Sequence, residues 1–367
     1  MTDERAGSAA PRPRRIVIGG LSVEAAAVRR GALFLVNIGV PLVVGAWRGE
    51  SRAALAAVIV GMLFGFADND GPLPSRLRLL LFDAGCLAAG GIAGYFSRAN
   101  PVVLWPLFIV ITFVVGLAAK AGREPLLAGR HMAMAFVVAA AIPTLTAVEI
   151  VYLLGAVLLA AATRTVDHLI AGPLPRQPGP PLQLPAARGG WVRFAAASAG
   201  AATAALWLGG TLDPIHTIWV VTTTLVVMQP DSRASYRRIV ERIAGTFAGV
   251  LGAGVITIVF HTPPIICFAI LIVAPLIPHH LANRYWLHTA LIALMVLLAY
   301  DLSELDQGIG KLLPERIIDM LIGSAMALVG AAFAFPRTAA AEIESLIGDA
   351  PSRPGRGKGS GTDDGSD

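Results

Sequence analysis

The chain has 367 residues, of which 55% are hydrophobic and only 14% are charged, and its mean hydropathy is +0.69. Soluble domains contain about 25% charged residues, so this composition excludes an ordinary soluble enzyme and predicts an integral membrane protein in a lipid bilayer. The formal net charge is +5, but the basic residues lie in short loops beside apolar runs, which argues against nucleic acid as a partner. Cys86 and Cys267 form neither a disulfide framework nor a metal-site spacing.

Apolar segments recur along the chain in two sets of six. They lie near 31–47, 53–67, 79–96, 101–119, 131–147 and 148–164, and then near 191–210, 214–229, 239–260, 262–279, 286–300 and 312–336. A helix needs about 20 residues to cross the hydrocarbon core, so the segments 53–67, 214–229 and 286–300 are predicted to be broken or shielded by neighbours. The sequence therefore predicts an all-α integral membrane protein of about twelve transmembrane helices.

The two sets read as a duplication, because Trp47 aligns with Trp207 and Arg78 with Arg238 at an offset of about 160 residues. With six crossings each, the two six-helix repeats are parallel, and a conduit is expected between them. The predicted domains are a disordered cytoplasmic N-terminus (1–30), a degenerate six-helix membrane repeat (31–164), a Pro/Gly-rich cytoplasmic linker (165–190), a second six-helix membrane domain (191–336) and a disordered cytoplasmic tail (337–367).

The distribution of the 29 Lys and Arg residues predicts the orientation. Most of them fall in segments that a cytoplasmic N-terminus places in the cytoplasm, where membrane proteins concentrate these residues. The first thirty residues also lack the form of a cleavable signal peptide. We therefore expect a multi-pass protein of the cytoplasmic (inner) membrane with both termini in the cytoplasm.

The stretch 213–254 joins two apolar runs through a dense cationic patch. The first run is expected to end at Gln229-Pro230, because proline donates no backbone hydrogen bond and disfavours helix at the residue before it. The patch consists of Arg233, Arg237, Arg238 and Arg242. One interpretation is that these arginines are ordinary cytoplasmic anchors beside a helix end. The functional interpretation is a vestibule for anions, since guanidinium groups fit planar carboxylates.

Three glycines continue the stripe of Arg238 and Arg242 along one helix face, namely Gly245, Gly249 and Gly252. Small residues mark the places where helices touch inside membranes, so these glycines are predicted to form a helix-packing seam. The two arginines would stand at its mouth. The hypothesis from the sequence is that an anion captured there passes along the seam.

Charged and titratable residues inside apolar segments mark pathways or ion pairs. Arg316 and Asp319 lie three residues apart, so they either pair on their own helix or take part in proton coupling. The imidazole pKa of about 6.5 makes His288, and its counterpart His131 in the first half, further candidates for carrying protons. No motif indicates a metal, a nucleotide or another cofactor, or the active site of an enzyme.

The run of Trp219, V-V-M-Q-P and S-x-x-R-R-x-x-E-R-x-x-G-T-x-x-G resembles the fusaric acid resistance (FUSC) and aromatic acid exporter family of bacterial membrane proteins. The resemblance covers roughly residues 190–336 and is much weaker before them. It implies a transporter that exports organic, in particular aromatic carboxylate, anions. Gln229 and Trp219 join the four arginines as predicted substrate-binding residues, Trp219 by stacking on an aromatic acid. His216 departs from the family, where an aromatic residue is commoner.

Two alternatives to an exporter stay open on the sequence. The same residues suit a passive anion channel, which differs from an exchanger in needing no counter-ion. A membrane scaffold that transports nothing is less favoured, since its sequence sign would be a large soluble domain. The expected partners are a small organic anion and the bilayer, and association into a homo-oligomer stays open.

Overall fold

The computed structural model describes residues 15–18, 21–68, 70–142, 144–174, 190–212, 214–230, 232–260, 262–280, 284–303 and 309–335. For residues 15–18, 21–23, 214–215, 232–236, 279–280 and 309–312 it describes the backbone alone. Apart from one short hairpin, the regular structure of these residues is helical, which confirms the predicted all-α class.

The helices correspond one to one with the predicted apolar segments. In the first half they are α1 (Ala25–Arg48), α2 (Ser51–Ala67), α3 (Leu73–Ser97), α4 (Pro101–Ala118) with the 3-10 turn η1 (Ala119–Ala121), α5 (Arg123–Ala141) and α6 (Ala147–Ala171). In the second half they are α7 (Gly190–Gly210), α8 (Pro214–Val227), α9 (Ser232–Val259), α10 (Pro263–Val273), which continues through η2 (Ala274–Leu276) into α11 (Ile277–His280), α12 (Tyr285–Ser303) and α13 (Ile309–Ala334).

Part of the predicted disordered N-terminus is ordered. Strands β1 (Arg15–Ile18) and β2 (Leu21–Glu24) pair antiparallel, with Arg15 opposite Glu24, and α1 begins at Ala25. The β-branched residues on either side of Gly19-Gly20 favour such a hairpin. The prediction of disorder is therefore wrong for these residues, and 1–14 and the tail from 336 lie outside the described part of the chain.

Seven helical stretches in the described chain are long and apolar enough to cross a membrane by length and composition. They are Ala25–Arg48, Leu73–Ser97, Pro101–Ala121, Ala147–Ala171, Arg237–Val259, Tyr285–Ser303 and Leu313–Ala334. The helices α2 and α8 are apolar but shorter, as predicted. The expectation of a short segment at 286–300 is wrong, because polar residues extend α12 beyond the apolar run to Ser303.

Two other predicted boundaries need correction. The linker was expected from residue 165, but α6 continues to Ala171 and ends at Gly172, whose φ of 69° lies in the left-handed region that favours glycine. The last turns of α6 are anchored by Asp167, which pairs with Arg29 at 2.9 Å and with Arg76 at 3.0 Å. Helix α5 begins at Arg123, and not near 131, because Arg123 and Glu124 open it and Arg130 interrupts its apolar residues, so a search for long apolar runs misses its start.

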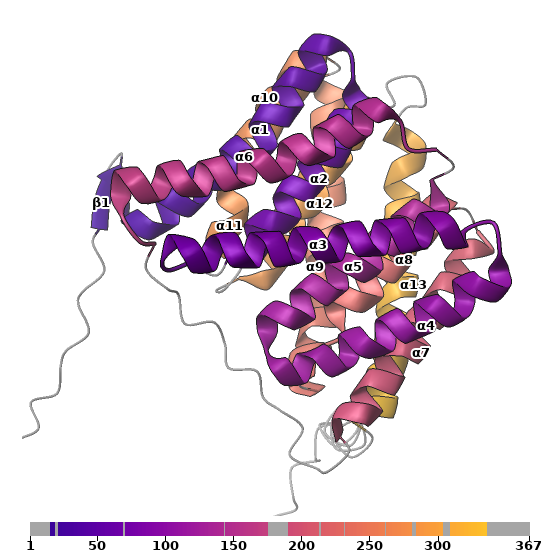
Figure 1. The fold of residues 1–367 in the computed structure, drawn as a ribbon. Helices are drawn as coiled ribbons and strands as arrows, with labels where there is room; N and C mark the ends of the chain where they lie inside the picture. The colour runs from indigo at the N-terminus through magenta and orange to yellow at the C-terminus, as the bar shows by residue number, and fades with distance from the viewer. Residues whose placement is uncertain are drawn as a thin grey trace, which may run out of the picture.

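Two large hydrophobic cores divide the molecule, and each draws on both halves of the sequence, while a small third cluster joins α2, α3 and α6 around Phe64, Leu80 and Ala160. One core joins α4 and α5 to α7, α8 and α13, and the other joins α1 and α2 to α10, α12 and the end of α9. In Figure 1, α1, α6 and α10 accordingly lie on one side of the molecule, and α4, α7 and α13 lie on the other. Helix α3 crosses in front of the space between them.

Glycines set the closest helix contacts, and these contacts occur in matching pairs. Gly90 and Gly94 of α3 lie against the backbone carbonyls of Met132 and Phe136 on α5, where a Cβ atom would overlap them. Gly245 of α9 lies in the same way against α12. The third helix of each half therefore packs tightly on the fifth helix of the same half.

Candidate functional site

The Gln-Pro break ends α8 as the sequence predicts, and side chains satisfy the carbonyls that it exposes. Pro230 has no N–H to offer the carbonyl of Val226, and the amide Nε2 of Gln229 donates to that oxygen at 2.8 Å. One residue before Gln229, the carbonyl of Met228 accepts a hydrogen bond from the guanidinium of Arg130 on α5. The break is thus part of the wall where α5 and α8 meet.

The predicted arginines stand at the start of α9. Arg237 pairs with Glu241 one turn later at 2.8 Å and is largely exposed, whereas the guanidinium of Arg238 lies 5.0 Å from the ring centre of Tyr285. Nε of Arg242 is buried, and within the described chain it has no hydrogen-bond partner. The side chain of Arg233 lies outside the described residues.

Arg130 is a functional candidate that the sequence reasoning missed. It is buried in α5, and the structure places it near Arg238 and Tyr285, close enough for the two guanidinium groups to repel each other. Among the described residues, no carboxylate pairs with Arg130, Arg238 or Arg242. A signal for Arg130 was present in the sequence, since a charged residue inside an apolar helix is costly and marks a pathway or a pair.

The ring of Trp219 lies in a cationic and aromatic cluster. The guanidinium of Arg316 stacks 3.4 Å from the centre of that ring. The ring of Tyr300 packs against it in an edge-on arrangement, with the two ring centres 5.8 Å apart. One face of the indole is therefore occupied by a cation, so only the other face is open to a guest. The indole N–H is buried and has no hydrogen-bond partner in the described structure.

Asp319 does not pair with Arg316, contrary to the simpler of the two expectations. Its carboxylate contacts Nδ1 of His216 on α8, a residue 103 positions away. His216, which stands where the family more often has an aromatic residue, is thus the partner of Asp319. Neither residue lines the cavity described below.

The glycine seam is filled. At Gly245 and Gly249 a Cβ atom would overlap the carbonyl oxygens of Trp286 and Ala290 on α12, and at Gly252 it would meet Leu294 at an ordinary 3.6 Å. The glycines therefore lie where α9 and α12 touch. The expected passage of an anion along them is wrong, because the backbone of α12 occupies that space.

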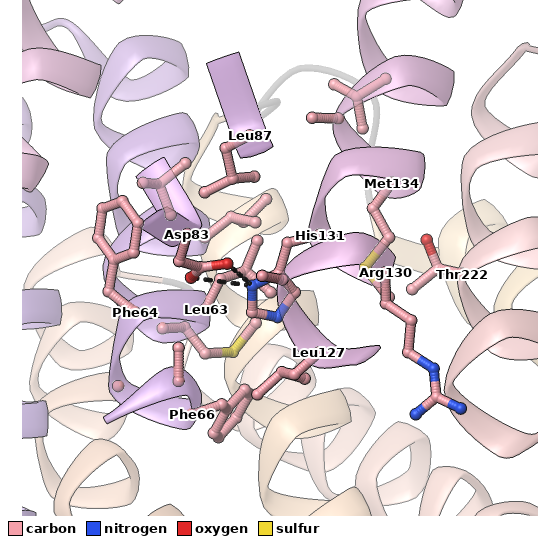
Figure 2. A pocket seen from close by; sticks show the side chains of 18 of the residues that line it. Leu63, Phe64, Phe66, Asp83, Leu87, Leu127, Arg130, His131, Met134 and Thr222 are labelled. Carbon is pink, nitrogen blue, oxygen red and sulfur yellow. Dashed lines mark hydrogen bonds and ion pairs between the residues drawn. The ribbon is translucent and has the colours of Figure 1, made fainter. Parts of the chain in front are cut away.

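The space for a guest lies instead in a cavity of about 2030 Å³ between helices of both halves. Its walls come from α1, α2, α3, α5 and α6 of the first half and from α8, α9 and α12 of the second. The predicted residues that line it are Trp219, Gln229, Arg237, Arg238, Arg242 and His288. Arg130 also lines it, and Figure 2 shows this side chain on the α5 wall beside Thr222.

Two histidines line the cavity in different settings. Nδ1 of His288 lies 3.0 Å from the carbonyl oxygen of Ile277, and its ring packs against Phe66. Nδ1 of His131 lies 2.8 and 3.0 Å from the two carboxylate oxygens of Asp83, and both side chains are buried (Figure 2). The sequence indicated His131 as a candidate but did not predict its contact with Asp83.

A cluster of ion pairs ties the first-half helices together at one end of the cavity. Asp68 follows α2 and pairs with Arg76 at 2.7 Å and with Arg164 at 3.2 Å. Burial by itself would raise the pKa of Asp68, but the hydrogen bond and charge of Arg76 and the charge of Arg164 lower it below its usual value. Asp70 pairs in turn with Arg30 at 2.7 Å. These carboxylates are neutralised, so they do not oppose the entry of an anion.

The described residues lack the ligand groups that metal sites need. Within them, no group of three or more His, Cys, Asp and Glu side chains is placed to hold a metal ion. Both cysteines are free thiols.

The comparisons with known proteins match the second half of the chain. Residues 201–330 match the model of the fusaric acid resistance protein-like family. No solved structure matches the chain.

Among curated proteins, the inner membrane protein YccS of Escherichia coli is 32% identical over 123 residues, which are 33% of this chain and 16% of that protein. An uncharacterized protein of Haemophilus influenzae is 29% identical over 118 residues, 32% of this chain and 16% of its own length. An uncharacterized protein, ORF2, of Neisseria gonorrhoeae is 28% identical over 120 residues, 32% of this chain and 28% of its own. The chain thus spans less than a third of each relative. Residues 201–330, which carry the Gln-Pro break and the arginines at the start of α9, are thus similar to the fusaric acid resistance protein-like family.

Proposed function

We propose that this chain forms a route by which organic anions, aromatic carboxylates in particular, leave the cytoplasm across the inner membrane. The observation that carries the proposal is the cavity between the two halves, whose wall holds guanidinium groups that no described carboxylate pairs, among them Arg130, Arg238 and Arg242. Arg130 is buried and Arg238 and Arg242 are partly buried. A buried cation without a counter-ion costs free energy, and an anionic guest would offset that cost. The proposed activity is transport, not enzymatic catalysis.

In this proposal, different residues of the cavity attract the anion, bind its carboxylate and contact its aromatic ring. Arg237 and Arg238 face the end of the cavity where α9 begins, and their charge concentrates anions there. Arg238 and Arg242 then bind the carboxylate, with Arg130 on the opposite wall. The rings of Tyr285 and Trp219 offer apolar faces to an aromatic acid. Pockets that enclose one drug-sized ligand measure about 300–1,000 Å³, so this larger cavity holds an anion together with water.

The direction of transport follows from the membrane potential. An anion that leaves the negatively charged interior gains about 2.3 kcal/mol per charge for each 100 mV. Export of a monoanion is therefore favourable without a further energy source. The orientation in this proposal places both termini, and the basic start of α9, in the cytoplasm, in line with the distribution of Lys and Arg.

We also propose that the two halves are six-helix repeats related by a pseudo-twofold axis, as the sequence predicts. The matching helix contacts support this. Within each half, the third helix packs on the fifth, which are α3 on α5 and α9 on α12. Between the halves, the fourth helix of one half packs on the first helix of the other, as α4 does on α7 and η2 on α1. The fifth helix of one half likewise packs on the second helix of the other, as α5 does on α8 and α12 on α2. The cavity would then lie around the axis that relates the repeats.

The test is flux of benzoate from proteoliposomes that contain the purified full chain. We expect Arg238→Gln with Arg242→Gln to reduce flux at low substrate by about 100-fold, since each charge-assisted hydrogen bond contributes about 1.5–3 kcal/mol. The matched control is Arg48→Gln, which removes the same charge from an exposed side chain that pairs with Glu50 outside the cavity. Unchanged flux in the double variant would contradict the proposal.

The same vesicles separate the alternatives. A passive channel gives a benzoate current that voltage alone sets, whereas an exchanger needs a counter-ion or proton gradient. Cyclohexane carboxylate, with the same charge and no aromatic ring, measures the contribution of stacking. If wild-type protein moves neither acid under any gradient, the scaffold alternative is supported instead.

A further inference from the structure

Asp83 and His131 form a buried pair in the wall of the cavity. Asp83 is on α3 and His131 on α5, at the level where Gly90 and Gly94 bring these helices together. The carboxylate contacts Nδ1 of the imidazole through both oxygens, at 2.8 and 3.0 Å. This contact places a hydrogen on Nδ1 and leaves the lone pair of the neutral ring on Nε2.

Nε2 of His131 is available to take up a proton. Within the described chain this nitrogen has no hydrogen-bond partner, and His131 lines the cavity. The surrounding side chains are apolar, and Figure 2 shows Leu63, Phe64, Phe66 and Leu127 around the pair. Without an extra proton the pair carries one negative charge in these apolar surroundings, and with a proton on Nε2 it is neutral.

Few charged groups face the pair from the helices packed around it. Arg164 of α6 interacts electrostatically with Asp83, but it is engaged with Asp68 and with the carbonyls of Ala160 and Phe64. On α3 itself the thiol of Cys86 is close to the carboxylate.

The other neighbouring elements add little charge at this level. On α5 the neighbouring Arg130 points to the opposite wall, toward α8 (Figure 2). The titratable residue of α2 is Arg52 at the far end of the cavity, and α4 has none in its sequence. On α8, His216 is paired with Asp319. On α12, His288 lies beyond the ring of Phe66.

We propose that the Asp83–His131 pair binds a proton that couples to the organic anion in the same cavity, so that each favours the binding of the other. The inference rests on the function proposed above, because it needs the anion to occupy the cavity near Arg130. Arg130, His131 and Asp83 all line this cavity, so an anion held by Arg130 shares one enclosed space with the pair, although the Arg130 side chain points to a different wall. An anion there repels the unprotonated, negatively charged pair and is tolerated by the neutral, protonated pair.

The sign of this coupling has a mechanistic consequence. Thermodynamic linkage requires that, if the anion promotes proton uptake, the proton strengthens anion binding by the same factor. An exchanger driven by protons needs the opposite sign, because its two substrates must compete.

The experiment measures proton uptake when benzoate binds to the purified full chain in weakly buffered detergent solution between about pH 6 and 9, where a carboxylate of ordinary pKa is ionised. We expect up to one proton to be taken up per benzoate bound. The benzoate affinity should fall as the pH rises, by up to about tenfold per pH unit. Benzamide, which is uncharged, should cause no uptake. These wild-type measurements need no variant to fold.

Two variants test whether the proton binds to the Asp83–His131 pair. Asp83→Asn, which keeps the shape of the side chain and removes its charge, should bind benzoate without proton uptake and with a flat pH profile. His131→Gln should behave in the same way. Asp319→Asn is the matched control, because it changes the other Asp–His pair, which does not line the cavity; its uptake should equal that of wild type.

The outcomes separate the two proposals. Benzoate binding with no proton uptake in wild type, or uptake that survives in Asp83→Asn and disappears in Asp319→Asn, would overturn the proton site and leave the anion route standing. Failure of wild type to bind benzoate at any pH would overturn both.

Discussion

At the scale of single residues, the side chains around the cavity differ in whether their charges are compensated. Asp68, Asp70 and Asp167 are held by arginines of neighbouring helices. The guanidinium groups of Arg130, Arg238 and Arg242 have no acidic partner among the described residues. These structural charges are thus neutralised within the protein, whereas Arg130, Arg238 and Arg242 face the space for a guest without an acidic partner.

The carboxylate of Asp68 makes a testable contribution to stability. Its pKa in the folded protein is lowered by Arg76 and Arg164 against the opposing effect of burial. The ionised Asp68 therefore stabilises the folded protein fully above about pH 3.9, the approximate pKa of Asp in the unfolded chain. This stabilisation is lost as the pH falls through the lower pKa that Asp68 has in the folded protein. We predict that Asp68→Asn lowers the free energy of unfolding at neutral pH by about 3 kcal/mol and reduces its dependence on acid.

The measurement is thermal unfolding in detergent micelles at several pH values. Glu50→Gln, which removes a carboxylate from the exposed pair with Arg48, serves as the control and should leave the melting temperature unchanged. Equal melting curves for wild type and Asp68→Asn at neutral pH would contradict the assignment.

Sequence reasoning reached some of these residues and missed others for a physical reason. The arginines of α9 stand together in the chain, so their shared position could be read from spacing. Asp83 and His131 are 48 positions apart, and His216 and Asp319 are 103 apart. Such pairs are created by helix packing, and spacing along one helix led to the wrong partner, Arg316, for Asp319.

At the scale of helices, the glycines of α9 differ in what they contact. We predict that Gly249→Ala destabilises the protein, because its methyl group would overlap the carbonyl of Ala290 on α12 and force the two backbones apart. Gly252→Ala on the same helix has room, with Leu294 at 3.6 Å, and should be neutral or stabilise by about 0.4–1 kcal/mol. Comparing the melting temperatures of the two variants checks this. Equal destabilisation by both would show that helix contact is not the cause.

Hydrophobic runs predicted the helices well, and polar residues caused the errors at their ends. The last turns of α6 are held by the ion pairs of Asp167 with Arg29 and Arg76, and in α5 the guanidinium of Arg130 donates a hydrogen bond to the carbonyl of Met228. A window of apolar residues cannot detect those interactions. The break at Gln229-Pro230 was predictable, since it follows from the missing N–H of proline alone.

At the scale of the whole molecule, the two cores that combine helices from both halves leave a cavity between them, and this cavity gathers the predicted binding residues with Arg130, Asp83 and His131. The sequence predicted that the arginines of α9 adjoin a route between the halves. It did not predict which surfaces enclose that route, because the glycine seam was interpreted as open when α12 fills it.

The central claim is that anions pass through this cavity. It is tested most directly by placing a single cysteine at Thr222, which lines the cavity (Figure 2), in a chain whose Cys86 and Cys267 are replaced by serine. Modification of Thr222→Cys with a negatively charged thiosulfonate should abolish benzoate flux in proteoliposomes, and benzoate should slow the modification. The same reagent on Arg48→Cys, outside the cavity, should leave flux unchanged. Full benzoate flux after complete modification of Thr222→Cys would contradict the account.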